Sequence, residues 1–188
     1  MLNKIFKYTL VLTLIGFLVG FNLPPRTVYT YTVKDIIGFD TPLSDYQGKV
    51  ILIVNLASQC AFTPQYAELQ KLYDEFGKDG LVVLGFPANN FNQEPETDEE
   101  VRHFCTQKYA ITFPLFSKVS VSGDDIHPLF AFLTQKNQNA RLDATVDWNF
   151  HKFIIDRRGR VVEHYQPKVK VYDQNVQKTL KKLLAEKS

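Results

Sequence analysis

Two runs of almost entirely apolar residues constrain the fold of this chain more than any other feature: VILIVNLA from Val50 and LVVLGFP from Leu81. Runs of this length without polar alternation are typical of strands that are buried on both faces of a sheet. The intervening segment, PQYAELQKLYDEFG, carries apolar residues at helical spacing, namely Tyr66, Leu69, Leu72, Tyr73 and Phe76. This order predicts a strand, a helix and a parallel strand, joined by a right-handed crossover.

The ends of this helix carry typical boundary residues. Thr63 is expected to be the N-cap, and Pro64 suits the first helical position because no N–H partner is needed there. Gly77 or Gly80 is expected to end the helix, since glycine readily adopts the left-handed conformation that follows a last turn.

Other segments predict the remaining strands. Residues 27–44 alternate and turn, which predicts a short hairpin or an edge strand, and residues 112–121 predict a third strand with a proline near its start. Residues 148–165 predict two strands that are joined by a turn at Gly159.

Three further helices are expected. A capping box of Thr97 and Glu100 begins one of them, residues 127–137 form another, and the Lys-rich tail forms a solvated C-terminal helix. The order of elements favours an α/β fold in which helices flank both faces of a central mixed sheet. It is similar to the order of a thioredoxin-like domain.

The N-terminal segment differs in composition from the rest of the chain. Lys4 and Lys7 precede residues 8–23, which carry no charge, and two prolines follow. This pattern is typical of a signal peptide or a membrane anchor, and a buried core helix is the competing interpretation. We expect residues 1–26 to be a signal or anchor with a linker, and residues 27–188 to be the globular domain. The protein would then be exported or membrane-anchored rather than cytoplasmic, with cleavage of the segment left open.

Charge and histidine spacing argue against two kinds of partner. The formal net charge is only +2, so the strongly basic surface of a nucleic-acid-binding domain is not expected. The histidines show no metal-ligand spacing, and surface or packing roles are expected for His103, His127, His151 and His164. We therefore expect neither a nucleic acid nor a metal ion as a partner.

Cys60 stands where the first apolar run gives way to the helix. Sites in such sheets lie beyond the carboxyl ends of the strands, and N–H groups near a helix start favour a thiolate over a thiol. The position therefore suits a reactive cysteine. A buried, inert cysteine is the competing interpretation, and in an exported chain Cys60 and Cys105, the only two cysteines, could form a structural disulfide.

Three separate stretches, in one order and spacing, resemble the motifs of the glutathione peroxidase family. They are NLASQCAFTPQYAELQKLY, LVVLGFPANNFNQEPETDEEVRHFC and VDWNFHKFIIDRRGRVVEHYQP. The resemblance spans residues 27–167, essentially the whole globular part, although Ala88 stands where many members carry a cysteine. It implies a thioredoxin-like fold, a peroxidase activity and a catalytic tetrad, which falls on Cys60, Gln93, Trp148 and Asn149.

The chemistry implied by this resemblance needs no cofactor, only a thiol reductant such as thioredoxin or glutathione. The Cys60 thiolate attacks a peroxide oxygen, releases water or an alcohol, and becomes a sulfenic acid. Gln93 and Asn149 can donate amide N–H groups and Trp148 its indole N–H, which would stabilise the thiolate and the leaving oxygen. Considered singly, these residues would be two loop amides and a core aromatic, so their roles depend on the resemblance.

Cys105, within EEVRHFCTQKY, matches the resolving position of the thioredoxin-dependent branch of the family. There it would condense with the sulfenic acid of Cys60 to form a disulfide, and a buried helical cysteine is the competing interpretation. Because a disulfide needs Cα atoms within about 7 Å, the helix around Cys105 is expected to unwind partly. The short segment 137–147 is similar to that of monomeric members, whose open site admits lipid hydroperoxides.

Two other functions would use the same residues. A redox sensor or oxidoreductase would pass oxidation from Cys60 to a partner protein, although the chain lacks the Cys-x-x-Cys of a dedicated dithiol exchanger. A non-enzymatic binding domain would keep the fold alone, although the presence of all four tetrad residues argues against it. The sequence therefore favours a monomeric peroxidase that acts on hydrogen peroxide and organic or lipid hydroperoxides in antioxidant defence.

Overall fold

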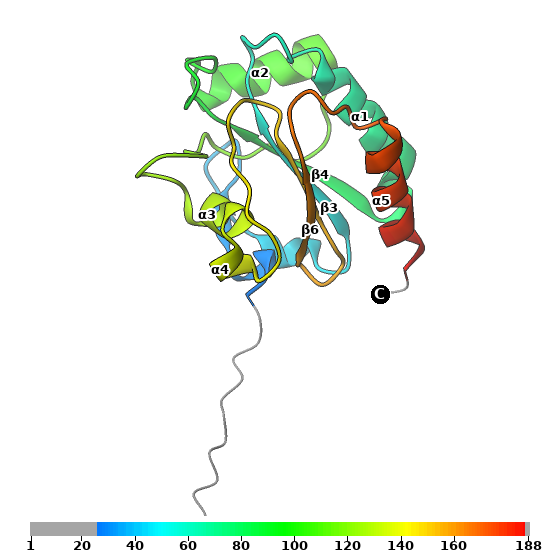
Figure 1. Ribbon diagram of the computed structural model, residues 1–188. Coiled ribbons are helices and arrows are strands. Elements are labelled where there is room, and N and C mark those ends of the chain that lie inside the picture. Colours follow the sequence, from blue (N-terminus) through cyan, green and yellow to red (C-terminus); the bar gives the residue numbers. More distant parts are fainter. Residues whose placement is uncertain (1–25, 187–188) are drawn as a thin grey trace, which may run out of the picture.

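A mixed sheet with the strand order β4-β3-β5-β6 forms the centre of the structure, a computed structural model that describes residues 26–186 (Figure 1). Strand β3 (Val50–Leu56) pairs parallel with β4 (Leu81–Pro87) and antiparallel with β5 (Lys152–Ile155). Strand β6 (Val161–Tyr165) pairs antiparallel with β5 and completes the predicted hairpin. Every residue of β3 and β4 is buried, as expected of strands covered on both faces.

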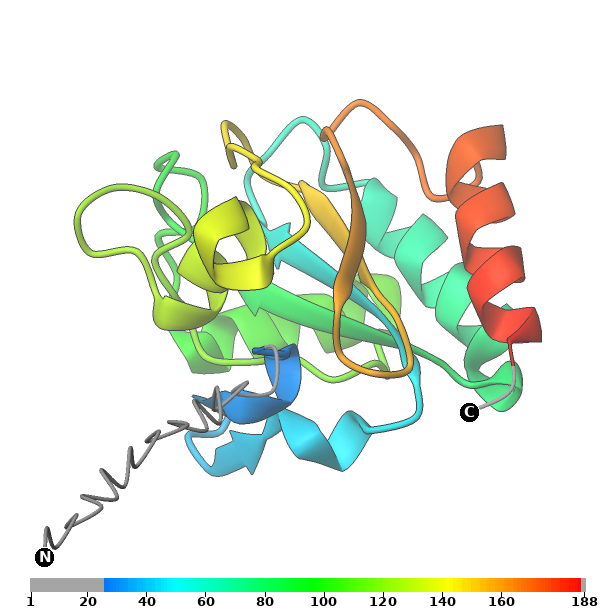
Figure 2. The ribbon, with the colours of Figure 1, turned by 60° about the horizontal axis from the view of Figure 1, so that its bottom comes forward.

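Helices cover both faces of this sheet, which confirms the predicted layers (Figures 1 and 2). Helices α1 (Gln65–Phe76) and α5 (Gln174–Ala185) lie on one face. Helix α3 (Pro128–Thr134) and the short α4 (Lys136–Asn139) lie on the other. Helix α2 (Asp98–Tyr109) packs beside α1 and begins with the predicted capping box.

The two cores on either side of the sheet follow from the alternation of side chains along β3. Leu52 and Val54 face α1 and α5 and join Leu69, Leu72, Val176 and Leu180. Ile51 and Ile53 face the opposite way and join Leu129, Phe130, Phe132 and Leu133 of α3. Because successive residues of a strand point to opposite faces, one apolar run supplies both cores.

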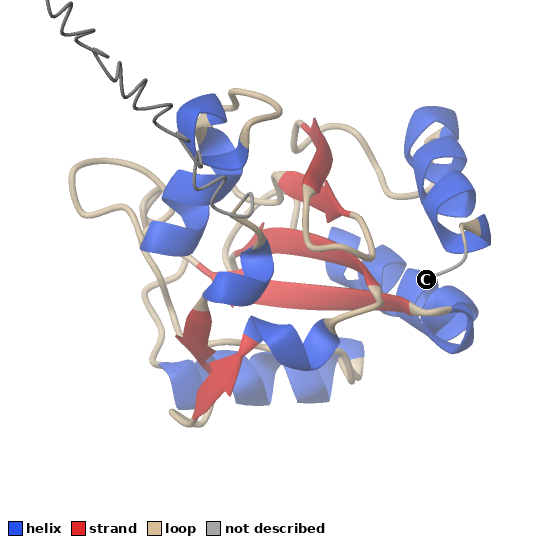
Figure 3. Cartoon of the chain, turned by 90° about the horizontal axis from the view of Figure 1, so that it is seen from below, coloured by secondary structure: helices blue, strands red, loops and turns tan. Residues whose placement is uncertain are grey.

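A separate two-stranded sheet precedes the central one in the chain, and Figure 3 shows it apart from the central strands. It pairs β1 (Thr32–Lys34) with β2 (Asp40–Pro42) antiparallel, which confirms the predicted hairpin. Short 3-10 helices flank it at η1 (Val28–Thr30) and η2 (Leu43–Tyr46), and a third, η3 (Gly77–Asp79), follows α1.

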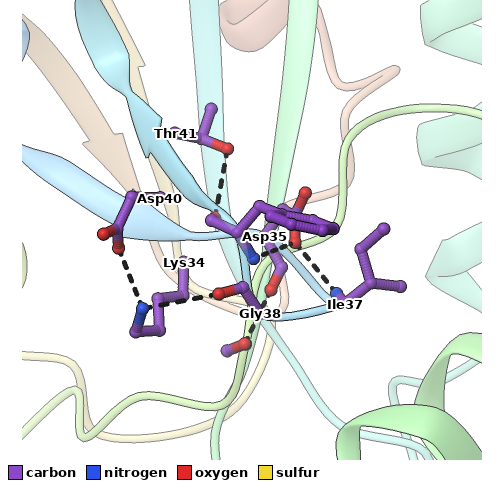
Figure 4. Close-up of polar contacts among 8 residues, drawn as sticks. Lys34, Asp35, Ile37, Gly38, Asp40 and Thr41 are labelled. Carbon is purple, nitrogen blue, oxygen red and sulfur yellow. Dashed lines mark hydrogen bonds and ion pairs between the residues drawn. The ribbon is translucent and has the colours of Figure 1, made fainter.

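The turn of this hairpin is organised by one carboxylate (Figure 4). The Asp35 Oδ1 accepts hydrogen bonds from the Ile37 N–H at 3.0 Å and the Phe39 N–H at 2.9 Å. Gly38 adopts φ +93, which glycine reaches without steric cost, and an exposed ion pair joins Lys34 and Asp40 across the strands. The aspartate therefore acts as a local turn former, as short acidic side chains often do.

The predicted third strand, residues 112–121, is wrong as a strand. This segment makes only isolated bridges, Gly85↔Leu115 and Asp35↔Phe116, on its two sides. Pro114 has no N–H, and its carbonyl accepts from the Gly85 N–H at 3.0 Å, while Ser117 donates instead to Lys34. The backbone is thus shared between two neighbours and forms a regular ladder with neither.

Of the predicted N-terminal signal or anchor with its linker, residues 1–26, all but the last residue lie outside the described residues. Among residues 26–186, no helix combines the length and the apolar character needed to cross a bilayer.

Two histidines meet at the β5–β6 hairpin, where both have the packing role that the sequence suggested. His151 is fully buried, and its Nε2 lies 3.0 Å from the Nδ1 of His164 on β6. The His151 ring stacks on Phe153 at 4.9 Å between centroids. Burial, with the neighbouring His164 and Lys152, lowers the pKa of His151 from 6.5 to about 3.

This buried imidazole is expected to make the fold sensitive to acid. In the unfolded chain His151 binds a proton near pH 6.5, whereas in the folded protein it stays neutral down to about pH 3. The stability that depends on this neutral imidazole is therefore complete above pH 6.5 and is lost as the pH falls toward 3. Between pH 7.5 and pH 4.5 this amounts to about 2–3 kcal/mol of unfolding free energy. Urea unfolding at both pH values should show that loss in the wild type and a smaller one in His151→Phe.

The matched control is His103→Gln, at an exposed histidine on α2, which should lose as much stability in acid as the wild type. If His151→Phe and the wild type lose equal stability between these pH values, His151 does not resist protonation in the folded protein.

Candidate active site

The turn between β3 and α1 holds Cys60 at the carboxyl end of the central strand. The Thr63 hydroxyl closes this turn, since it donates to the Ala57 carbonyl and accepts from the Cys60 N–H, both at 3.0 Å. The Phe62 N–H donates to the Cys60 Sγ at 3.4 Å. Cys60 is only 7% exposed, so its sulfur meets backbone donors in a largely water-free turn.

The predicted capping role of Thr63 is wrong. Helix α1 begins at Gln65, with Pro64 preceding it as a residue that makes no side-chain capping bond. Because Pro64 occupies the N-cap position, Thr63 lies one residue before it, and its hydroxyl binds Ala57 and Cys60 instead. Helical-type bonds from the Thr63 and Gln65 N–H groups instead lead the chain from the cysteine turn directly into α1.

The loop after β4 is bonded to the residues that precede Cys60. Both oxygens of the Glu94 carboxylate accept from Ser58, at 2.8 Å from its N–H and 2.6 Å from its hydroxyl. The Gln59 N–H donates to the Gln93 carbonyl at 3.0 Å. Burial raises the pKa of Glu94, and the two Ser58 bonds act in the opposite direction. Gln93 is thereby held beside the cysteine turn.

Asn55, the penultimate residue of β3, binds the loop that carries Trp148 and Asn149. Its carbonyl accepts from the Phe150 N–H at 2.7 Å, and its side-chain oxygen accepts from the His151 N–H at 2.9 Å. Its Nδ2 donates to the Trp148 carbonyl at 3.2 Å. One strand end therefore positions both the cysteine turn and this loop.

The four residues that the sequence singled out as a tetrad come from three loops at this edge of the sheet. The Asn149 Nδ2 donates to the Gln93 Oε1 at 2.9 Å, so these two amides are in direct contact. That bond leaves the Gln93 Nε2 as the donor it can offer to an anion. Trp148 is 38% exposed and lies against Phe91, with 5.4 Å between ring centroids. Trp148 and Phe91 thus form an aromatic rim at the same edge.

Cys105 lies in α2 as a fully buried free thiol, and Cys60 is a free thiol as well. Both sulfurs belong to the core between the sheet and α1. The Tyr66 hydroxyl has no well-oriented hydrogen-bond partner. It lies close enough to Cys105 to lower the pKa of that thiol, against the larger effect of burial. Burial raises the pKa of the Cys105 thiol to about 11. In this conformation Cys105 is therefore a protonated and unreactive thiol at neutral pH.

Three buried polar residues at this site escaped the reasoning from sequence: Asn55, Glu94 and Lys152. Asn55 interrupts the apolar run of β3 and Lys152 stands at the start of β5, which was the available signal. A buried polar group must find partners, and those of Asn55 and Glu94 lie far away in the chain. Among residues 26–186, no group of three or more His, Cys, Asp or Glu side chains is placed to hold a metal ion.

Comparison with known proteins shows which family this chain is similar to. A family model described as "Glutathione peroxidase" matches residues 28–134. The hydroperoxy fatty acid reductase gpx1 of Synechocystis is 47% identical over 146 residues, which cover 74% of this chain and 86% of that protein. The glutathione peroxidase-like peroxiredoxin gpx1 of Schizosaccharomyces pombe is 44% identical over 138 residues, 73% of this chain and 87% of its own length.

The solved structures show the same likeness. The crystal structure of GPX1 from T. cruzi superposes with a TM-score of 0.67 at 32% identity, over 85% of this chain and 97% of that one. Together with the strand order of the central sheet, this confirms the predicted thioredoxin-like α/β fold.

Proposed function

This chain belongs to the glutathione peroxidase family, and from that membership we propose how its residues carry out the thiol-dependent reduction of hydroperoxides. We assign Cys60 as the reacting thiol and Gln93, Trp148 and Asn149 as the donors around it. The observation that carries this assignment is the meeting of the Gln93–Asn149 amide pair with the cysteine turn at the end of β3.

The first step balances without a cofactor. The Cys60 thiolate attacks one peroxide oxygen, the O–O bond breaks, and the sulfur becomes a sulfenic acid. The departing oxygen leaves as hydroxide or alkoxide and takes a proton to give water or an alcohol. Donors that point at this oxygen lower the barrier because negative charge develops there as the bond breaks. We assign Gln93, Asn149 and the indole of Trp148 as the side chains that supply them.

We propose that Cys105 resolves the sulfenic acid. Condensation of the two forms a Cys60–Cys105 disulfide and releases water, and a thiol reductant such as thioredoxin or glutathione then restores both thiols. Both free sulfurs lie in one core, which supports this pairing. The high pKa of Cys105 means that α2 must first open locally, because only the thiolate is an effective nucleophile.

Lipid hydroperoxides are the substrate class that the rim of the site favours. Trp148 and Phe91 present aromatic rings at the edge where a peroxide would enter. The segment 137–147 contains only the end of the short α4 as regular structure and no long insertion, so a monomer with an open site is proposed. Residues 4–23 would hold this enzyme at a membrane or direct its export, which would bring it near such substrates.

Turnover assays with each peroxide and each reductant test this function. We expect the full chain to reduce both hydrogen peroxide and a phospholipid hydroperoxide, and to turn over faster with a thioredoxin system than with glutathione. Catalytic turnover with either reductant separates a peroxidase from a redox sensor, which would oxidise a partner protein only stoichiometrically. Absence of turnover with both reductants would contradict the proposed cycle, and activity on hydrogen peroxide alone would remove the lipid substrate.

A further inference from the structure

Phe150, directly after Trp148 and Asn149, has a backbone conformation that an aromatic residue rarely adopts. Its φ is +67, in the left-handed region that normally favours glycine. Such a conformation is unfavourable for a residue other than glycine and persists only where its surroundings hold it in place. The loop that carries Trp148 and Asn149 is therefore held in a backbone conformation that is unfavourable by itself.

The main chain of this turn is held by two buried side chains on neighbouring strands. Asn55 holds it from β3 through the three bonds described above. Lys152, at the start of β5, donates from its Nζ to the Phe150 carbonyl at 2.7 Å and to the Pro167 carbonyl at 3.5 Å. The Phe150 ring also packs edge-on against Tyr66 at 5.5 Å. Of these contacts, the Lys152 bond is the one made to the Phe150 carbonyl.

A lysine is a costly residue at this position. Lys152 is fully buried, and within residues 26–186 no carboxylate lies within ion-pair distance of its Nζ. Burial lowers its pKa to about 8, although Glu68 and Asp173 act in the opposite direction from further away. An apolar side chain, such as that of its strand neighbour Ile154, would fill the same face of β5 without desolvating a charge. Packing therefore does not explain the residue.

We propose that Lys152 is a positioning residue of the peroxidase site: its Nζ secures the left-handed Phe150 turn and thereby sets the placement of Trp148 and Asn149 relative to Cys60. The inference rests on the proposed function and adds a residue to it. A left-handed residue turns its carbonyl out of the regular strand ladder, and a buried carbonyl needs a donor. A long side chain that ends in an amine, such as that of Lys152 at the start of β5, can reach the Phe150 carbonyl.

Lys152→Met tests this because it keeps the length of the side chain and removes every donor. Trp148 is the only tryptophan of the chain, so its fluorescence reports on this loop alone. We expect a shifted Trp148 emission, greater quenching by acrylamide, and a rate constant for Cys60 oxidation by hydrogen peroxide that falls about 10- to 100-fold. Lys152→Gln, which keeps a neutral donor on a slightly shorter chain, should recover part of both signals and serves if the methionine variant folds poorly.

Thr134→Val is the matched control. Thr134 is also buried and donates to a main-chain carbonyl, that of Phe130 at 2.7 Å, but it lies in α3 on the opposite face of the sheet. Its loss should lower stability without changing the Trp148 emission or the oxidation rate of the folded protein. If Lys152→Met behaves in the same way, Lys152 is merely structural and the inference is wrong.

The fluorescence and the rate separate this inference from the proposed function. A wild type that does not react with hydrogen peroxide would overturn the function, whatever Lys152 does. A wild type that reacts, alongside a Lys152→Met variant with unchanged rate and unchanged Trp148 emission, would overturn only the role of Lys152.

Discussion

Replacing Cys60 with serine is expected to lower peroxide turnover by at least roughly three orders of magnitude while leaving the fold intact. Serine has nearly the same shape, and its hydroxyl can accept the Phe62 N–H bond that the sulfur now accepts. A hydroxyl does not ionise at neutral pH, however, and without a neighbouring general base it is a poor nucleophile toward peroxide. The change therefore removes the chemistry and keeps the turn.

Stopped-flow mixing with hydrogen peroxide and steady-state turnover measure this effect, and thermal unfolding followed by circular dichroism checks the fold. The Cys105→Ser variant provides the control, because it loses the other cysteine and should keep the first oxidation step. Retention of more than a tenth of the wild-type rate by Cys60→Ser would mean that another group reacts with peroxide. The assignment of the site would then be wrong.

Replacing Cys105 with serine should separate the two halves of the cycle. The rate constant for oxidation of Cys60 should stay within about twofold of the wild type, because Cys105 takes no part in breaking the O–O bond. Turnover with thioredoxin should fall by about 100-fold or more, because the sulfenic acid can no longer form the disulfide that thioredoxin reduces. A split between the first step and steady-state turnover is the expected signature of a resolving cysteine.

The structure also indicates how Cys105 becomes available. The capping box of Thr97 and Glu100 secures the first turn of α2, whereas Ala110 at the other end adopts a left-handed φ of +50. In α2 only Val101 and Cys105 are buried, and Phe104 and Tyr109 also pack against the Tyr66 ring, so opening of the last turns gives up these ring contacts but leaves Val101 in place. We therefore expect α2 to open from its C-terminal end, which contains Cys105.

Peptide mapping of the peroxide-treated wild type by mass spectrometry checks the pairing directly. A Cys60–Cys105 link is the expected product, and it should be absent from the Cys105→Ser variant. If the wild type instead carries a sulfinic acid or a glutathione adduct on Cys60 with Cys105 still free, the protein uses a one-cysteine cycle. In that case Cys105 is the buried helical cysteine that its position also allows.

Much of the fold could be predicted because the deciding signals are local. The apolar runs of β3 and β4 and the helical spacing of α1 each reflect burial of a contiguous segment. The predicted strand over residues 112–121 failed for a reason that is not local. Its apolar composition was strand-like, but its main chain bonds to Gly85 on one side and to Lys34 and Ile36 on the other.

In the candidate site, too, some residues could be predicted from the sequence and others could not. Cys60 was assigned from its place between a buried strand and a helix and from the motif around it, and Gln93, Trp148 and Asn149 followed from their motifs. Thr63 was predicted to cap the helix, but its oxygen accepts from the Cys60 N–H, which only the turn itself brings near.

The amino-acid sequence alone determined the order of the strands and helices apart from residues 112–121, the position of the candidate reactive cysteine and the family to which its motifs are similar. It could do so because periodicity and motif spacing are properties of neighbouring residues. Only the tertiary structure decided which buried polar groups hold the site together. Asn55 meets Trp148, Ser58 meets Glu94, and Asn149 meets Gln93 across separations of 93, 36 and 56 residues. Such partners are chosen by the folded sheet, because each desolvated donor or acceptor must be satisfied by whatever the packing brings within reach.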